Sequence, residues 1–192
     1  MGEDRRIRKS KAALKKALLV LMRKKEFHKI SVKELCGLAE LNRSTFYANY
    51  RDTEELLLDV HTDIFMQMRE ALGEEWTAVY DALPGKRKDA LCRIIRYLDG
   101  RREVFILLLS NNDGNIFEKN MTDYYGKLYV PQDASWRERY VFLYHSIGSF
   151  SLICKWLEEQ RPCEPEELAE LICSMSESGK ENGKKGGAQE RQ

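Results

Sequence analysis

The chain has 192 residues, 43% of them hydrophobic and 33% charged, a composition that permits a folded core and excludes a largely disordered protein. Its longest apolar run, Val104 to Leu109, is far shorter than the roughly 20 residues that a membrane-spanning helix needs. The charged start from Met1 to Lys16 does not have the pattern of a signal peptide, so we expect a cytoplasmic protein. The five cysteines show no two-residue spacing typical of zinc or redox sites, and we expect neither metal nor cofactor.

The formal net charge of +1 hides an uneven distribution. Residues 1–51 contain 14 Lys and Arg against 5 Asp and Glu, whereas residues 52–192 contain 18 against 26. A basic first part on an acidic remainder is typical of a nucleic-acid-binding module attached to a domain of another kind. A solvated, lysine-rich helix surface explains the charge equally well.

Apolar residues recur at helical spacing almost everywhere and no alternating strand pattern persists, so the fold class is predicted to be all-α. A first helix is expected from about Arg8 to Lys25. Ser31 and Glu34 have the spacing of a capping box and predict a short helix over 32–39. After a turn at Glu40, Asn42 is placed to cap a third helix that starts at Arg43.

A further start signal at residues 52–55 opens a long fourth helix. Beyond residues 83–85 we expect helices at roughly 86–99, 101–110, 115–129, 134–159 and 164–176. The predicted organisation is a helix-turn-helix domain over 1–52, a larger helical domain over 53–176 and a disordered tail over 177–192, which has no large apolar side chain.

Two short helices joined by a three- to four-residue turn, packed on a preceding helix, are the parts of a helix-turn-helix. On a helical wheel Phe46 and Tyr50 point into the small core, whereas Ser44 and Ala48 face outward. That outer face is small and able to form hydrogen bonds, which lets a helix approach base edges in the major groove.

Individual roles follow from side-chain chemistry. Arg43 is predicted to read a base by a bidentate contact to guanine, and Thr45 to contact a thymine methyl group or a phosphate. Tyr47 is expected to donate to a phosphate. Ser31 and the amides of its helix suit a phosphate, and Lys33 can reach a base or a phosphate. The structural alternatives are helix capping and solvated side chains.

The segments 30–35, 42–50 and 54–57 together resemble the DNA-binding region of the TetR family of transcriptional regulators, over about residues 8–60. The resemblance implies about nine helices, a homodimer, and a second domain that senses a ligand. It adds Asn49, Tyr50 and Thr53 to the DNA-binding set. Residues 144–157 also resemble the subgroup related to the dihydroxyacetone kinase operon activator.

Three positions depart from the family pattern. Glu40 stands where glycine is usual in the turn, at a cost of about 1 kcal/mol if it is left-handed. Asn49 stands where histidine is frequent and is still able to bond a phosphate. Thr53 replaces the usual lysine, which weakens one phosphate contact.

The resemblance places the dimer interface on the last two helices, where small residues permit close approach and apolar ones supply area. A buried intrachain helix has the same composition. The candidate interface residues are Phe142, Ser146, Ser149, Phe150 and Ile153. Candidate lining residues for an effector pocket, each of which also fits a plain core position, are Phe65, Met68, Trp76, Tyr80, Phe105, Tyr124, Tyr140 and Tyr144.

The function predicted from these patterns is a transcriptional regulator, a repressor in the first instance, that binds a palindromic double-stranded DNA operator as a homodimer and is released by a small-molecule effector. Arg5, Arg6, Arg8 and Lys9 form either an arm for the minor groove or a solvated start. The alternative function is a co-activator or adaptor whose second domain docks a protein. A helical enzyme is disfavoured because the three histidines are scattered and no nucleophile–base spacing occurs.

Overall fold

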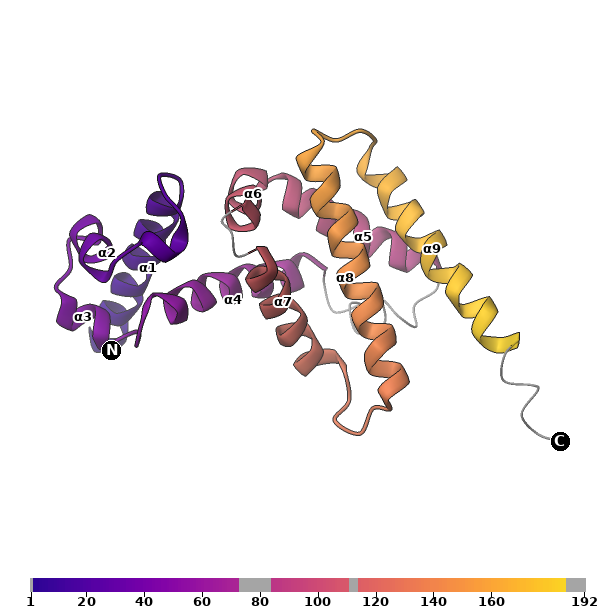
Figure 1. Cartoon of the computed structure of the whole chain (residues 1–192), viewed down its shortest axis with the longest axis horizontal. Helices are drawn as coiled ribbons and strands as arrows, with labels where there is room; N and C mark the ends of the chain where they lie inside the picture. The colour runs from indigo at the N-terminus through magenta and orange to yellow at the C-terminus, as the bar shows by residue number, and fades with distance from the viewer. Residues whose placement is uncertain (1, 73–83, 111–113, 186–192) are drawn as a thin grey trace. The chain divides into compact units, whose positions relative to one another are not determined.

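The computed structural model describes residues 2–72, 84–110 and 114–185, and within these ranges the chain is all-α (Figure 1). No strand occurs among the described residues. A short 3-10 turn, η1 (Phe27–Lys29), follows the first helix. The α-helices are α1 (Gly2–Met22), α2 (Val32–Ala39), α3 (Arg43–Tyr47), α4 (Thr53–Leu72), α5 (Pro84–Asp99), α6 (Arg102–Ser110), α7 (Gly114–Tyr129), α8 (Trp136–Glu158) and α9 (Pro165–Lys185).

The predicted all-α fold class is confirmed, and the two ends differ most from expectation. Helix α1 begins at Gly2 instead of near Arg8, and α9 continues to Lys185 instead of ending near residue 176. The continuation of α9 is rich in Glu and Lys, which are good helix formers, and extending an existing helix needs no new nucleus. The part of the expected tail over 177–185 is therefore helical, and residues 186–192 lie outside the described residues.

The chain divides into two compact units by its own contacts. Unit 1 consists of residues 1–66 and 103–124, and unit 2 consists of residues 67–102 and 125–192. Helices α4 and α7 each contribute to both units. The first three helices thus share a unit with most of α4, and the domain boundary at residue 52 stays a prediction.

Unit 1 contains two buried clusters. The first joins α1 to the short helices and is built on the fully buried side chains of Leu14, Leu18, Leu35, Phe46 and Leu56. The second is aromatic: the ring of Phe117 lies 5.2 Å from Phe65 and 5.9 Å from Phe105, centroid to centroid. Burial of these large side chains supplies the main favourable free energy of the unit, at about 1.5–3 kcal/mol for each.

The packing of α5 on α9 organises unit 2. Lys88 pairs with Glu170 and Arg96 pairs with Glu166, so the two helices run in opposite directions. The indole Nε1 of Trp156 donates to the carbonyl oxygen of Cys163 at 2.8 Å, which fixes the turn between α8 and α9. Among the helices described, none has the length and apolarity to cross a membrane.

Candidate nucleic-acid interface

The start of α2 is held by the predicted capping box. The hydroxyl of Ser31 accepts from the backbone N–H of Glu34, and the carboxylate of Glu34 accepts from the backbone N–H of Ser31 at 3.0 Å. The Nζ of Lys25 donates to the same carboxylate at 2.6 Å. That hydrogen bond, followed by those from Ser31, lowers the pKa of Glu34 to about 2. Helix α2 therefore begins at a fixed residue, and the charge of the Glu34 carboxylate is paired with Lys25. Lys33, beside Glu34 in the chain, is exposed.

The turn between α2 and α3 contains a left-handed residue at Glu40, the position where the family pattern has glycine. Glu40 has φ 55° and ψ 40°, and the N–H of Leu41 donates to the carbonyl oxygen of Cys36 at 2.9 Å. A left-handed non-glycine residue costs about 1 kcal/mol. Asn42 occupies the N-cap of α3 by its backbone conformation but forms no side-chain capping bond, contrary to expectation, and its side chain is exposed.

Helix α3 presents the outer face that the helical wheel predicted. Arg43, Ser44 and Ala48 are exposed, and Tyr47 is 59% exposed. Thr45 is half-buried. Phe46 lies on the opposite side, fully buried, with its ring edge-on to Tyr47 at 5.4 Å. A short helix is thus anchored by one aromatic side chain and leaves a small polar surface for a groove.

Tyr50 lies in the core and not on this outer face. It is 2% exposed, and its hydroxyl donates to Oδ2 of Asp59 on α4 at 2.7 Å. Burial, and then this hydrogen bond to a carboxylate, raise the pKa of Tyr50. The expected contact between Tyr50 and DNA is therefore replaced by a supporting role, because neither its ring nor its hydroxyl faces solvent.

Asp59 binds two lysines of α1 as well as Tyr50. Its carboxylate lies 3.1 Å from Nζ of Lys15 and 3.4 Å from Nζ of Lys11, and Lys15 also pairs with Asp63 at 2.6 Å. Burial favours a higher pKa for Asp59, but the hydrogen bonds from Tyr50 and Lys15 and the lysine charges outweigh it and lower the pKa. The amine of Lys11 also stands 5.0 Å from the centre of the Tyr50 ring. One carboxylate thus ties α1 and the end of the α3 segment to α4.

The two remaining predicted DNA contacts have limited access. The amide of Asn49 donates to the carbonyl oxygen of Thr45 at 2.7 Å, so one of its donors is already used. Thr53 is half-buried at the start of α4. There the backbone N–H of Glu55 donates to Asp52 at 2.8 Å, and the N–H of Arg51 donates to Glu55 at 2.6 Å. The residues with free access are Ser31, Lys33, Arg43, Ser44 and Tyr47.

The described residues among those expected to line an effector pocket belong to both units. Phe65 and Phe105 belong to the aromatic cluster of unit 1, where the ring of Tyr124 lies 5.5 Å from Phe65. Met68 is buried and belongs to unit 2. Tyr140 and Tyr144 are exposed, and Trp76 and Tyr80 lie outside the described residues.

Helix α8 carries aromatic side chains on a buried side and on an exposed side. Phe142, Phe150 and Ile153 were expected at the dimer interface but are buried within the chain, and a residue already buried is not accessible to a second copy. Tyr140 and Tyr144 are 67% and 68% exposed. Ser146 and Ser149 are half-buried.

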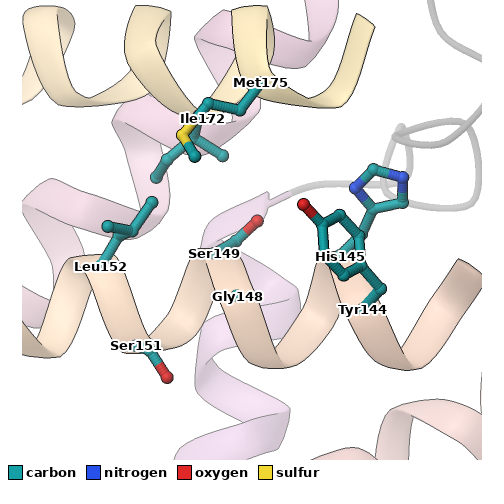
Figure 2. A pocket seen from close by; sticks show the side chains of 8 residues that line it. All are labelled: Tyr144, His145, Gly148, Ser149, Ser151, Leu152, Ile172 and Met175. Carbon is teal, nitrogen blue, oxygen red and sulfur yellow. The ribbon is translucent and has the colours of Figure 1, made fainter. Parts of the chain in front are cut away.

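An open groove runs along the exposed side of α8, against α9 (Figure 2). It has a volume of about 320 Å³. Gly148 leaves its floor open, since nothing lies within 4 Å of where a Cβ would stand. The lining residues are Tyr144, His145, Gly148, Ser149, Ser151, Leu152, Ile172 and Met175.

Known structures resemble this chain over nearly its whole length. A TetR transcriptional regulator from Streptococcus agalactiae 2603V is 24% identical and matches with a TM-score of 0.63, over 92% of this chain and 98% of that one. The chain has the TetR fold. The dihydroxyacetone kinase operon activator DhaS is 18% identical and matches with a TM-score of 0.51, over 88% of this chain and 95% of that one. A TetR regulator from Rhodococcus sp. RHA1 is 16% identical with a TM-score of 0.52, over 88% of this chain and 96% of that one.

Among curated proteins, the chain is similar to the uncharacterized HTH-type transcriptional regulator YxbF of Bacillus subtilis (strain 168). The two are 22% identical over an alignment of 176 residues, and the match covers 86% of this chain and 44% of that protein. The chain therefore spans less than half the length of this relative. No protein-family model matches the chain. The TetR resemblance seen in residues 8–60 thus agrees with the fold of the chain as a whole.

We expect Tyr50→Phe to lower the free energy of unfolding of this TetR-fold protein by about 1–2 kcal/mol, because it removes a hydrogen bond to a partly shielded carboxylate. Chemical denaturation measures the change. The matched control is Tyr47→Phe, whose hydroxyl is exposed and which should change stability by less than about 0.5 kcal/mol. Equal stability of Tyr50→Phe and the wild type would show that Asp59 does not hold Tyr50.

Proposed function

We propose that this protein is a sequence-specific DNA-binding transcriptional regulator that binds a palindromic operator as a homodimer. One observation carries the proposal: α3 exposes Arg43, Ser44 and Tyr47 while Phe46 anchors the helix from behind. A helix placed in the major groove needs small side chains for close approach and one long donor to read a base. The basic charge of residues 1–51 supports phosphate binding around it.

Each exposed side chain has a role in this proposal. Arg43, in the first turn of α3, reads guanine through its two parallel N–H groups. Tyr47 and the N-terminal amides of α2, next to Ser31, position the module on phosphates. Lys33 adds a further phosphate or base contact. Ser44 and Ala48 allow the backbone of α3 to come close to the base edges.

The exposed side of α8 supports a dimer. Tyr140 and Tyr144 lie one turn apart on the same side of the helix, and Leu171 and Met175 on α9 are each 50% exposed. This surface carries protruding apolar side chains next to the groove at Gly148. In an isologous interface the same surface of each copy meets the other, so the side chains of one copy can enter the groove of its partner. Two modules related by two-fold symmetry then read the two halves of a palindrome.

The sign of regulation is proposed to be repression, by occupation of the operator. The proposal includes no effector residue set, because the candidates that the structure describes are divided between buried side chains and an exposed helix face. A second candidate function is an adaptor that docks another protein. The exposed aromatic residues of α8, with Trp136 68% exposed, favour it.

Substitution of Arg43 tests base reading. On an operator selected from a random duplex pool, we expect Arg43→Ala to weaken binding by about 1–3 kcal/mol and to relax the preference at one base pair of each half-site. Fluorescence anisotropy with all base variants at that position measures both effects. The control Arg69→Ala removes the same charge from an exposed position on α4, outside the interface, and should retain the preference. An unchanged base preference in Arg43→Ala would contradict the assignment.

Substitution of Tyr144 tests the dimer. We expect wild-type protein to have twice the monomer mass by light scattering and Tyr144→Glu to be monomeric, because an unpaired charge buried at an interface costs several kcal/mol. The control Leu128→Glu places the same charge on α7, where the leucine is 44% exposed, and should stay dimeric. The adaptor function would be favoured by two results together: a wild-type protein that is monomeric, and a loss of binding to another protein in Tyr144→Glu.

A further inference from the structure

The first turns of α1 carry a cluster of cations on a helix. Residues 5–9 are all exposed, and they include Arg5, Arg6 and Lys9. They belong to one continuous helix with the buried Leu14 and Leu18. Since residues four and seven positions apart share a side of a helix, Arg5, Lys9 and Lys16 face away from those leucines.

Two lysines on another side of α1 are paired with carboxylates. Lys11 and Lys15 are paired with Asp59 and Asp63, so their charge is compensated. Within the part of the chain that the structure describes, no carboxylate pairs with Arg5, Arg6 or Lys9. Of the five residues from 5 to 9, four carry a positive charge and none carries a negative one.

These turns lie on the side of the module that carries α3. The amine of Lys11 stands 5.0 Å from the ring of Tyr50, which follows α3 closely in the chain. The N-terminal end of α1 lies beside α3 in Figure 1. At a rise of about 1.5 Å per residue, Lys9 lies roughly 3 Å and Arg5 roughly 9 Å further along the axis than Lys11. The first turns of α1 thus form the end of that helix that lies beside α3.

The helical conformation of these residues determines which part of the DNA they can contact. An extended arm was one expectation for these residues, and such an arm enters the minor groove. A helix with its side chains is about 10–12 Å across, whereas the minor groove is about 6 Å wide. A helix therefore meets the phosphates at the edge of the groove and not the bases inside it. Long Arg and Lys side chains are suited to that contact.

We propose that Arg5, Arg6 and Lys9 form a second DNA-binding surface, which holds the phosphate backbone that flanks the major groove read by α3. The inference rests on the proposed function and extends the contact beyond the helix-turn-helix. The partner is the sugar–phosphate backbone of the same duplex. The surface adds affinity and salt dependence but no sequence preference, because phosphates are the same at every base pair.

The test compares two triple variants with equal loss of charge. The first is Arg5→Gln, Arg6→Gln and Lys9→Gln. The control is Lys24→Gln, Arg69→Gln and Lys127→Gln, all at exposed positions outside α1. Each protein is titrated by fluorescence anisotropy into the selected operator and into a random-sequence duplex, at several salt concentrations. Thermal unfolding checks that both variants retain the stability of the wild type.

For the first variant we expect the affinity to fall about tenfold or more, and the slope of log K against log salt to decrease by about 0.9 for each phosphate that the variant no longer neutralises. The preferred operator sequence should not change. Shortening the duplex to the two half-sites should weaken wild-type binding and leave the variant unaffected.

Equal affinity and equal salt slope for the first variant and the control would overturn the proposal. An altered base preference would also overturn it, because it would place these side chains in a groove. If wild-type protein selects no sequence, the proposed function fails by itself. The slopes on the random-sequence duplex then still decide whether the first turns of α1 bind phosphates.

Discussion

The carboxylate of Asp59 is the interaction on which the candidate interface depends. It accepts a hydrogen bond from the buried hydroxyl of Tyr50 and lies between two lysines of α1. Helix α3 has only five residues and is too short to be stable alone. Its orientation comes from Phe46 and Tyr50 beneath it, and Asp59 fixes Tyr50 to the two long helices. A partly shielded carboxylate thus supports the orientation of the exposed face of α3, which carries Arg43, Ser44 and Tyr47.

The same helix that carries Asp59 also holds the aromatic cluster of unit 1. His61, two residues further along α4, is buried, lies 3.1 Å from the amide of Asn120 on α7, and meets the ring of Phe117 at 4.8 Å. Burial lowers the pKa of His61 to about 4, so it is neutral at ordinary pH. Helix α4 therefore joins a salt-bridged network on one side to a neutral aromatic core on the other, within one compact unit.

Local signals explain what could be predicted from the sequence. The capping box at Ser31 and the inward direction of Phe46 depend on residues within one or two turns of each other. The pairing of Lys15 with Asp63 spans 48 positions, and nothing in either segment distinguishes it from solvated charges. The inward direction of Tyr50 is visible on a helical wheel, but its hydrogen bond to Asp59 depends on how the next helix packs and is not.

The buried side of α8 could not be predicted from the sequence. The helix has aromatic residues on several sides, so a helical wheel alone does not tell the inner side, with Phe142 and Phe150, from the outer side, with Tyr140 and Tyr144. Packing against the rest of unit 2 decides. The length of α9 exceeds the prediction for another reason: a low apolar content suggests disorder, whereas Glu and Lys sustain a helix that packing has already started.

The most direct test of sequence reading by a dimer is selection of bound sequences from a random duplex DNA pool by the wild-type protein. We predict one enriched palindromic motif, with half-sites separated by about one helical turn or a multiple of it, because two copies of α3 enter successive major grooves on one side of the duplex. A pool without enrichment, or a single motif without two-fold symmetry, would contradict sequence reading by a dimer.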